Sequence, residues 1–425
     1  MSDRTPTGPR TRLSDLDRRF WWLWFAVLVT WTGRFVVPFM SLFLTGEAGL
    51  SGSAAGLVVA GYGGGVVLSA FAGGLCADLL GRKRTLVASL VLSAATLTVV
   101  PAFDDPVVIA ALLCVFGLVN GAAQPAIATL IVDIAPRQHL RAAFAYKYWA
   151  VNLGYAAGPL FAGLLADHAF RYLFFGQAGV LLVAAGIVVA RVPETLPTTG
   201  PTASGKNDEQ AAVGISDVLR DRVFVAFVLA MFGYSVVYVQ STVALPLAMV
   251  DDGFSTQDYG YLLTLNGVLL CLLQLPSARV LGRWRREAVL VGALCVTAVG
   301  VGLQAVATSW PVYALAVTVW TLGEMGGHPS AQSIASDLSS PRARGRYQGV
   351  YALAFSAATM VAPVVGGTVL DRFGAPALWV SCAALCLSIA CCLALTARVR
   401  ERRIHELVRA DGARRERPHP DAVKP

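Results

Sequence analysis

The sequence contains an internal repeat. The segment Pro125–Asp133 reads PAIATLIVD, and Pro329–Asp337 reads PSAQSIASD. The segments Gly154–Asp167 (GYAAGPLFAGLLAD) and Ala358–Asp371 (ATMVAPVVGGTVLD) also share a pattern, and both pairs are offset by 204 residues. A repeat of this length in a chain rich in apolar helix predicts two halves of similar structure that lie in a membrane.

Long apolar stretches fill both halves. Hydrophobic residues make up 56% of the chain and charged residues 14%, which is the membrane side of the globular average. About 20 apolar residues are enough to cross the hydrocarbon core of a bilayer. We therefore predict an all-α integral membrane protein with 12 transmembrane helices, arranged as two pseudo-symmetric six-helix bundles. The predicted spans are at about residues 20–44, 53–77, 84–103, 106–134, 140–167, 170–191, 223–250, 257–280, 286–308, 311–338, 345–371 and 375–397.

The basic residues predict the orientation. Nearly all of the 34 Lys and Arg residues fall in the N-terminal segment, the even-numbered loops or the C-terminal tail, whereas Arg171 and Arg372 fall on the other side. This asymmetry places both termini in the cytoplasm, and the Arg-, Ala- and Val-rich composition suggests the cell (inner or plasma) membrane of a bacterium. The predicted parts are a cytoplasmic N-terminus (1–19), an N-terminal six-helix bundle (20–191), a flexible cytoplasmic linker (192–222), a C-terminal six-helix bundle (223–397) and a basic cytoplasmic tail (398–425).

The sequence gives no support to several function classes. The eight cysteines lie in apolar runs without metal-ligand or disulfide spacing, so we expect no metal. Neither a nucleophile motif nor a pair of carboxylates is present, so we expect no enzyme, no catalytic residue and no cofactor. The net charge of +8 is explained by contact with anionic lipid rather than with nucleic acid. The expected partners of a monomeric chain are the lipid bilayer, protons and a small-molecule substrate.

Ionisable side chains deep in apolar stretches are functional candidates, because burying a charge in hydrocarbon is costly. Glu324 lies near the middle of its predicted helix, and His328 lies one turn later on the same face. We expect Glu324 to carry a proton, since burial disfavours the charged form of a carboxyl group, and His328 to tune or relay it. A fixed pair of Glu324 with Arg34 or Lys147 is the alternative, and binding of an anionic substrate is a further role for Arg34.

Polar and aromatic side chains are expected to complete a cavity for an amphipathic molecule near the bilayer midplane. The polar candidates are Gln124, Asn152, Gln240, Asn266 and Gln332. The aromatic candidates are Trp31, Phe35, Tyr62, Tyr155, Tyr234, Tyr238 and Trp320. Packing between helices is the alternative role for each of them.

The loop after the second apolar stretch carries a dense motif. Gly74–Arg84 reads GLCADLLGRKR, which resembles the signature loop of the major facilitator superfamily, GxxxD(R/K)xGR(R/K), with Leu79 replacing a basic residue. The resemblance implies a gating loop made of Gly74, Asp78, Gly81, Arg82 and Lys83. Asp78 can cap a helix N-terminus, and Arg82 can pair with Asp133. A solvated turn is the alternative. The equivalent loop of the second half is degraded, so only the first is expected to form a full latch.

A run of small residues marks the fifth predicted helix. Gly154, Gly158, Pro159 and Gly163 form GxxxGPxxAG. Small residues four apart let helix backbones approach closely, and proline removes a backbone donor. The run resembles the antiporter signature of the same superfamily, which implies export rather than uptake. Generic tight packing is the alternative.

Further segments narrow the resemblance. Tyr148–Leu153 (YWAVNL) and Leu322–Glu324 (LGE) look like the multidrug/proton branch of the 12-helix drug:H+ antiporter family, with similarity over roughly 15–400. The resemblance implies a secondary active transporter that exports a small hydrophobic or amphipathic compound, such as a drug or secondary metabolite, by alternating access. Lys147 and Thr242 stand where the branch can carry acids, which favours neutral, zwitterionic or weakly acidic substrates. The alternatives are a proton-coupled importer of a nutrient or peptide and a non-transporting membrane sensor.

Overall fold

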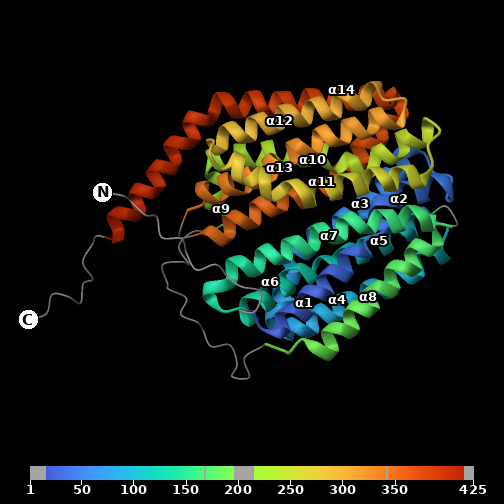
Figure 1. Cartoon of the computed structure of the whole chain (residues 1–425), viewed down its shortest axis with the longest axis horizontal. Coiled ribbons are helices and arrows are strands. Elements are labelled where there is room, and N and C mark those ends of the chain that lie inside the picture. The colour runs from blue at the N-terminus through green and yellow to red at the C-terminus, as the bar shows by residue number, and fades with distance from the viewer. Residues whose placement is uncertain (1–15, 167–168, 196–214, 341–342, 416–425) are drawn as a thin grey trace, which may run out of the picture. The chain divides into compact units, whose positions relative to one another are not determined.

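The computed structural model describes residues 16–166, 169–195, 215–340 and 343–415, and within them it contains helices but no strands. The first half of the chain forms α1 (Arg18–Thr32), α2 (Val36–Gly46), α3 (Gly52–Leu80), α4 (Arg82–Val99), α5 (Pro106–Gly121), α6 (Ala123–Ile134), α7 (Leu140–Ala166) and α8 (Arg171–Arg191) (Figure 1). The second half forms α9 (Ile215–Arg220), α10 (Arg222–Asp251), α11 (Thr256–Leu281), α12 (Arg286–Leu303), α13 (Trp310–Leu338) and α14 (Arg344–Arg415).

Each of the predicted spans is mostly helical where it is described, which confirms the all-α prediction, although the first span is interrupted between Thr32 and Val36. Nine segments of the described chain are long and apolar enough to cross a membrane. One of them, Arg344–Leu407, contains two predicted spans, which are separated at Gly374, where φ is 78°. The predicted spans that do not meet this measure, α11 and α13, carry more polar residues, Glu324 and His328 among them.

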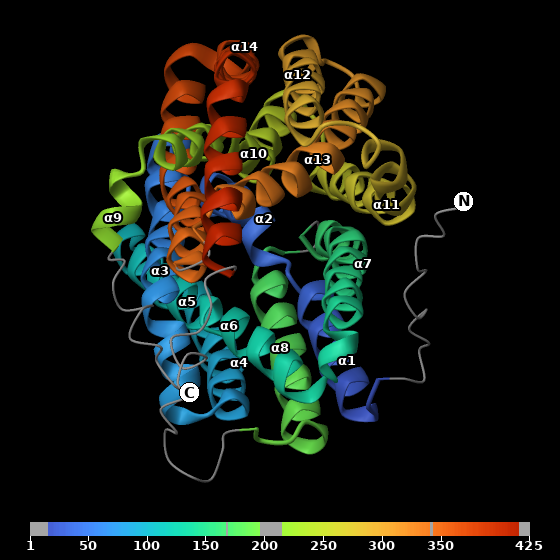
Figure 2. The ribbon, with the colours of Figure 1, turned by 90° about the vertical axis from the view of Figure 1, so that its left-hand side faces the viewer.

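The helix contacts divide the chain into two compact units. Unit 1 comprises Met1–Ala48, Gly64–Thr198 and Ser255–Cys271, and unit 2 comprises Gly49–Gly63, Thr199–Phe254 and Leu272–Pro425. In unit 1, α1 packs against α7 and α8, and α4 packs against α5, α6 and α8 (Figure 2). In unit 2, α12 packs against α13 and α14, and α10 packs against α14. Each unit therefore buries its own helix faces.

The beginnings of α3 and α11 pack outside their own half of the sequence. Within unit 2, the carboxylate of Asp371 accepts hydrogen bonds from the backbone N–H of Gly52 (3.0 Å) and of Ser53 (2.7 Å). A carboxylate is favoured at a helix N-terminus, where backbone N–H groups lack helical partners. Within unit 1, a Cβ at Gly260 of α11 would lie 2.7 Å from the carbonyl oxygen of Pro159. The start of each helix is thus held by the other half of the repeat.

Both ends of the predicted linker are structured, contrary to the expectation of a uniformly flexible segment. Glu194 and Thr195 hydrogen-bond to unit 1. The short helix α9 buries Val218 completely. Composition suggested flexibility because Pro, Thr and Gly dominate the segment, but single polar and apolar residues are enough to attach its ends. Residues 196–214 lie outside the described residues.

Candidate functional site

A break in the first predicted span positions Arg34. We expected one helix over residues 20–44, but α1 ends at Thr32 and α2 begins at Val36. The buried side chain of Gln177 on α8 holds this break, because its Oε1 accepts hydrogen bonds from the backbone N–H of Phe35 (3.0 Å) and of Val36 (2.8 Å). These two N–H groups have no partner within α1, and the amide oxygen satisfies them inside the unit.

Glycine is required next to Arg34. A Cβ at Gly33 would lie 2.4 Å from Cγ1 of Val180, so a side chain at this position would separate the break from α8. The glycine also accepts the hydrogen bond from the Phe35 N–H through its carbonyl oxygen (2.9 Å). The side chain of Arg34 therefore projects from backbone that is fixed by close packing and by hydrogen bonds.

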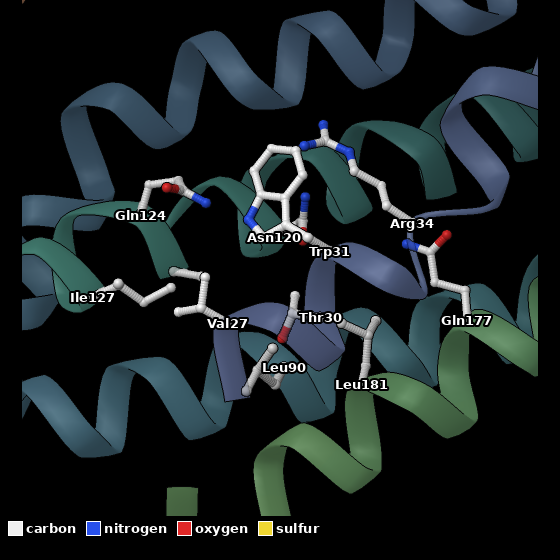
Figure 3. Close-up of a pocket in the computed structure, with 11 residues that line it drawn as sticks. Val27, Thr30, Trp31, Arg34, Leu90, Asn120, Gln124, Ile127, Gln177 and Leu181 are labelled. Atoms are coloured by element: carbon white, nitrogen blue, oxygen red, sulfur yellow. The ribbon is translucent and has the colours of Figure 1, made fainter. Parts of the chain in front are cut away.

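Arg34 lines a small recess inside unit 1, with a cavity volume of about 30 Å³ (Figure 3). Its guanidinium carbon lies 4.6 Å from the centre of the Trp31 ring, which is a cation–π contact. The lining residues come from α1, the break, α4, α5, α6 and α8: Val27, Thr30, Trp31, Arg34, Leu90, Asn120, Ala123, Gln124, Ile127, Gln177 and Leu181. Gln124, Trp31 and Arg34, all predicted cavity residues, are thus brought together.

Lys147 adjoins this recess through Gln124. The Nζ atom of Lys147 donates a hydrogen bond to Oε1 of Gln124 at 3.4 Å. The predicted cavity residue Asn152 is buried further along α7 and is not among the described lining residues. Unit 1 therefore carries two of the predicted intramembrane cations near one recess.

The proposed proton site forms a separate cluster in unit 2. Glu324 of α13 is 9% exposed, and its Oε1 accepts a hydrogen bond from the hydroxyl of Tyr238 on α10 at 3.2 Å. The ring of Tyr238 contacts the rings of His328 (4.9 Å between centroids) and Trp320 (6.2 Å) edge to face. Four predicted site residues are thus in contact around one carboxyl group.

Gln240 lies apart from this cluster. It is 1% exposed, and its Nε2 donates a hydrogen bond to the carbonyl oxygen of Ala362 at 2.9 Å. A Cβ at Gly366 would lie 2.1 Å from Oε1 of Gln240, so the glycine makes room for the amide between α10 and α14. These contacts correspond to packing between helices, the alternative role that the sequence left open for Gln240.

The predicted gating loop is organised by a residue that we did not predict. The carboxylate of Glu194 accepts hydrogen bonds from the backbone N–H of Arg82 (3.0 Å), Lys83 (3.3 Å) and Arg84 (3.2 Å) at the start of α4. Gly81 precedes them with φ of 103°, a conformation that favours glycine. Gly74 lies on α3, and Asp78 is exposed near the end of that helix.

Arg82 and Asp133 lie 3.6 Å apart, as the predicted pair requires. The hydroxyl of Thr195 also donates a hydrogen bond to Oδ2 of Asp133 (2.5 Å). The second half repeats the pair, because Arg286 forms an ion pair with Asp337 at the same offset of 204 residues. The second loop therefore keeps this ion pair although the rest of its motif is degraded, because one ion pair needs two residues and not the whole motif.

The glycine run of α7 packs against two helices. A Cβ at Gly154 would lie 2.7 Å from Cβ of Trp31, and one at Gly158 would lie 2.9 Å from the carbonyl oxygen of Thr32. One at Gly163 would lie 3.1 Å from Cα of Gln257 on α11. The run therefore sets the distance from α7 to the end of α1, directly beside Arg34.

Two residues of the site were missed from the sequence. Gln177 is a buried polar residue in the otherwise apolar α8, and this is a signal that could have identified it. Glu194 follows α8 in a segment whose composition indicated a linker, and nothing in its sequence context pointed to the start of α4. Both act on the backbone of a segment more than 100 residues away in sequence.

Comparison with known proteins agrees with this architecture. The family model described as Major Facilitator Superfamily matches residues 23–255 and 238–420. An uncharacterised MFS-type transporter of Bacillus subtilis, YttB, is 26% identical over 372 residues, which cover 86% of this chain and 92% of the relative. The multidrug resistance protein MdtH of Aeromonas hydrophila is 26% identical over 360 residues, covering 83% and 87%.

Among solved structures, the nucleoside transporter NupG superposes with a TM-score of 0.75 at 12% identity, covering 89% of this chain and 99% of that one. At this identity the likeness concerns the fold alone. The two matches to the family model together span nearly the whole described chain, and the relatives include proteins named multidrug resistance proteins. The chain therefore belongs to the Major Facilitator Superfamily.

Proposed function

We propose that this protein is a proton-coupled exporter of small hydrophobic or amphipathic compounds. The observation that carries the proposal is the buried carboxyl group of Glu324, which accepts a hydrogen bond from Tyr238 and lies beside His328. A buried ionisable group of a membrane transporter that lies among polar and aromatic side chains is suited to bind and release a proton in each cycle. The multidrug resistance proteins among its relatives support export as the direction.

In this mechanism, Glu324 binds a proton from the outside and releases it to the cytoplasm. The hydroxyl of Tyr238 donates a hydrogen bond to the carboxylate and stabilises it, so Glu324 can stay charged during the part of the cycle in which it holds no proton. Entry of one proton through a potential of 100 mV supplies about 2.3 kcal/mol, which supports roughly a 50-fold concentration ratio of a neutral substrate. Useful efflux is therefore possible with one proton per cycle.

The proposal also includes the location of the protein, the orientation of its termini, its oligomeric state and its gate contacts. The protein is a multi-pass membrane protein of the bacterial inner membrane, with both termini in the cytoplasm, and it works as a monomer. The asymmetric distribution of basic residues supports this orientation. The Arg82–Asp133 pair and its copy Arg286–Asp337 act as gate contacts on the cytoplasmic side, where both pairs connect helix ends.

The test is exclusion of compounds by pump-deficient cells. The panel contains ethidium (cation), norfloxacin (zwitterion), chloramphenicol (neutral) and fusidate (anion). Cells with the wild-type protein should exclude at least one compound, and an uncoupler should abolish the exclusion. Glu324→Gln should fail at matched membrane levels, whereas Glu47→Gln should not, because Glu47 is exposed and accepts a hydrogen bond from the Phe170 N–H.

Three results would contradict the proposal. Accumulation of the compounds instead of exclusion would indicate an importer. Equal exclusion by wild type and Glu324→Gln would remove Glu324 from the coupling step. Exclusion that survives the uncoupler would remove the proton gradient as the energy source.

A further inference from the structure

We infer that the recess in unit 1 binds the carboxylate of an aromatic organic acid, with Arg34 as the anion-binding residue and the Trp31 ring against the apolar body of the molecule. This inference concerns substrate class, and it rests on the proposed function for the direction of transport. It makes the protein an exporter that selects anionic rather than cationic amphipathic compounds.

The charge of the recess supports an anion. Among the lining residues that the structure describes, Arg34 has the one ionisable side chain, and none of the others has a carboxylate. The other polar lining groups are the hydroxyl of Thr30 and the amides of Asn120, Gln124 and Gln177. Lys147 adds a second positive charge next to the recess through its hydrogen bond to Gln124. A cationic ligand would meet like charge here, whereas a carboxylate would meet two cations and several amide groups.

Six of the described acidic residues of unit 1 make contacts away from the recess. Several lie at helix ends, where they accept hydrogen bonds from backbone N–H groups or form the gate pair. These residues are Asp17, Glu47, Asp105, Asp133, Glu194 and Asp258. These carboxylates therefore act at helix termini or in the gate pair, and none of them is among the described lining residues of the recess.

The size of the recess matches a small acidic group. A cavity volume of about 30 Å³ gives room for roughly two water molecules. The two oxygens of a carboxylate need similar room, and the planar guanidinium of arginine presents paired N–H donors that fit them. The recess is too small for a whole drug-sized molecule, so the rest of the ligand must lie outside it.

Trp31 provides a surface for that remainder. Its ring is in contact with the Arg34 guanidinium (4.6 Å) and is half-buried, so ring and cation border the same recess (Figure 3). An aromatic acid can place its carboxylate on Arg34 and its ring against the indole. The pairing of an aromatic face with a cation favours aromatic over purely aliphatic acids.

Arg34 is also pre-organised. The helix break that carries it is fixed by two hydrogen bonds to Gln177 and by the contact of Gly33 with Val180. A binding group held by its surroundings loses little freedom when a ligand arrives, so more of the interaction appears as affinity. Gln177 is thus a positioning residue for the anion site.

The test compares three ligands with one aromatic body. Indole-3-acetate is an anion, indole-3-acetamide is its neutral isostere, and tryptamine is a cation. Binding of each is measured by isothermal titration calorimetry on the purified full-length protein in detergent, without a proton gradient. The variants are Arg34→Gln, which removes the charge, and Arg34→Lys, which keeps the charge but removes the paired donors.

The matched control is Arg191→Gln. Arg191 makes the same type of contact with Trp22 (4.8 Å from its guanidinium carbon to the ring centre), but it lies at the end of α8 and does not line the recess. It therefore reports what the loss of an arginine–tryptophan contact does to the fold alone. Retained monodispersity in detergent is required of each variant.

The inference predicts that wild type and Arg191→Gln bind indole-3-acetate about ten- to a hundredfold more tightly than indole-3-acetamide. Arg34→Gln should lose this preference while its affinity for the amide stays nearly unchanged, and Arg34→Lys should keep part of it. Equal binding of the anion and the amide by wild type, tighter binding of tryptamine, no measurable binding of the anion, or a preference that survives Arg34→Gln would each overturn the inference.

The binding test and the export test can refute their proposals independently of each other. A carboxylate preference that depends on Arg34, in a protein that drives no gradient-dependent efflux, would support the anion site and refute the proposed direction or coupling. Gradient-dependent export of ethidium but not of fusidate, with no carboxylate preference, would support the proposed function and refute the anion site.

Discussion

Replacing Gly154 by alanine should weaken the contact between α7 and α1. The new Cβ would lie 2.7 Å from Cβ of Trp31 and 2.8 Å from the backbone nitrogen of Thr32, whereas favourable carbon contacts begin near 3.5 Å. Both atoms belong to the backbone or its first side-chain carbon, so no flexible group can move aside. The helices must separate by nearly 1 Å, which we expect to cost about 1–3 kcal/mol of the free energy of unfolding.

Gly179→Ala on α8 is the matched control. A Cβ at Gly179 would meet no atom within 4 Å, so this substitution should stabilise its helix by about 0.5–1 kcal/mol. Thermal unfolding of the purified proteins, followed by tryptophan fluorescence, should rank Gly179→Ala at or above wild type and Gly154→Ala below it. Because Trp31 and Arg34 border the same recess, Gly154→Ala should also weaken indole-3-acetate binding. Equal stability of the two variants would refute the close-approach role of the glycine run.

Three other predictions follow from single contacts. Gln177→Leu removes the described acceptor of the Val36 N–H, whereas the Phe35 N–H keeps the carbonyl oxygen of Gly33, so it should cost about 1–3 kcal/mol and weaken anion binding at Arg34 in titration calorimetry. Glu194→Ala removes the cap of α4 and should lower the melting temperature through a loss of about 1 kcal/mol, with ligand binding unchanged. Arg400→Met strands the carboxylate of Glu287, which the 3% exposed arginine contacts at 3.0 Å, so it should cost about 3–5 kcal/mol, and adding Glu287→Met should restore much of the loss. A result with ligand binding lost in Glu194→Ala, or with no rescue in the double variant, would contradict these assignments.

The sequence predicted the helices well because apolar length is a local property of the chain. The break that positions Arg34 was not predicted, since it depends on a hydrogen bond to Gln177, which lies 142 residues from Phe35. Gly33 and Arg34 interrupt an apolar run in the sequence, but these two residues alone do not indicate where the helix ends. Contacts at this separation are set by packing, which one sequence does not reveal.

The candidate site was predicted unevenly for similar reasons. The spacing of Glu324 and His328 places them on one helix face, and this could be read from the chain directly. The hydrogen bond from Tyr238 to Glu324 spans 86 residues and depends on how α10 meets α13. Gln240 was grouped with the cavity because it is polar, but its amide packs against α14. Polarity alone therefore does not distinguish residues of the site from polar residues that pack between helices.

The internal repeat is a better predictor of contacts in the second half than the sequence motif of the loop. The pair of Arg82 and Asp133 is repeated by Arg286 and Asp337 at the same offset, although the second loop has lost most of the motif. An ion pair between helix ends needs only its two residues, so it can persist while the surrounding glycines change. Positions related by the repeat are thus a better guide to second-half contacts than the full motif.

Substrate charge can be tested through energetics as well as binding. Exchange of one proton for one monoanion moves two charges, which corresponds to roughly 4.6 kcal/mol at 100 mV and about a two-thousandfold gradient. Exchange for a neutral compound moves one charge and gives about a 50-fold gradient. Reconstituted vesicles at a set potassium diffusion potential should therefore accumulate indole-3-acetate more steeply with voltage than a neutral substrate, and equal steepness would contradict an anionic substrate.

Proton movement in reconstituted vesicles tests coupling through Glu324 most directly. Wild-type protein, Glu324→Gln and Glu47→Gln are reconstituted with a pH-sensitive dye in the lumen, and the compound that cells exclude best is supplied on one side. The account predicts that substrate moving in one direction drives protons in the other for wild type and Glu47→Gln, and that Glu324→Gln moves no protons with substrate. Substrate-driven proton movement that persists in Glu324→Gln, or substrate movement without protons in wild type, would contradict it.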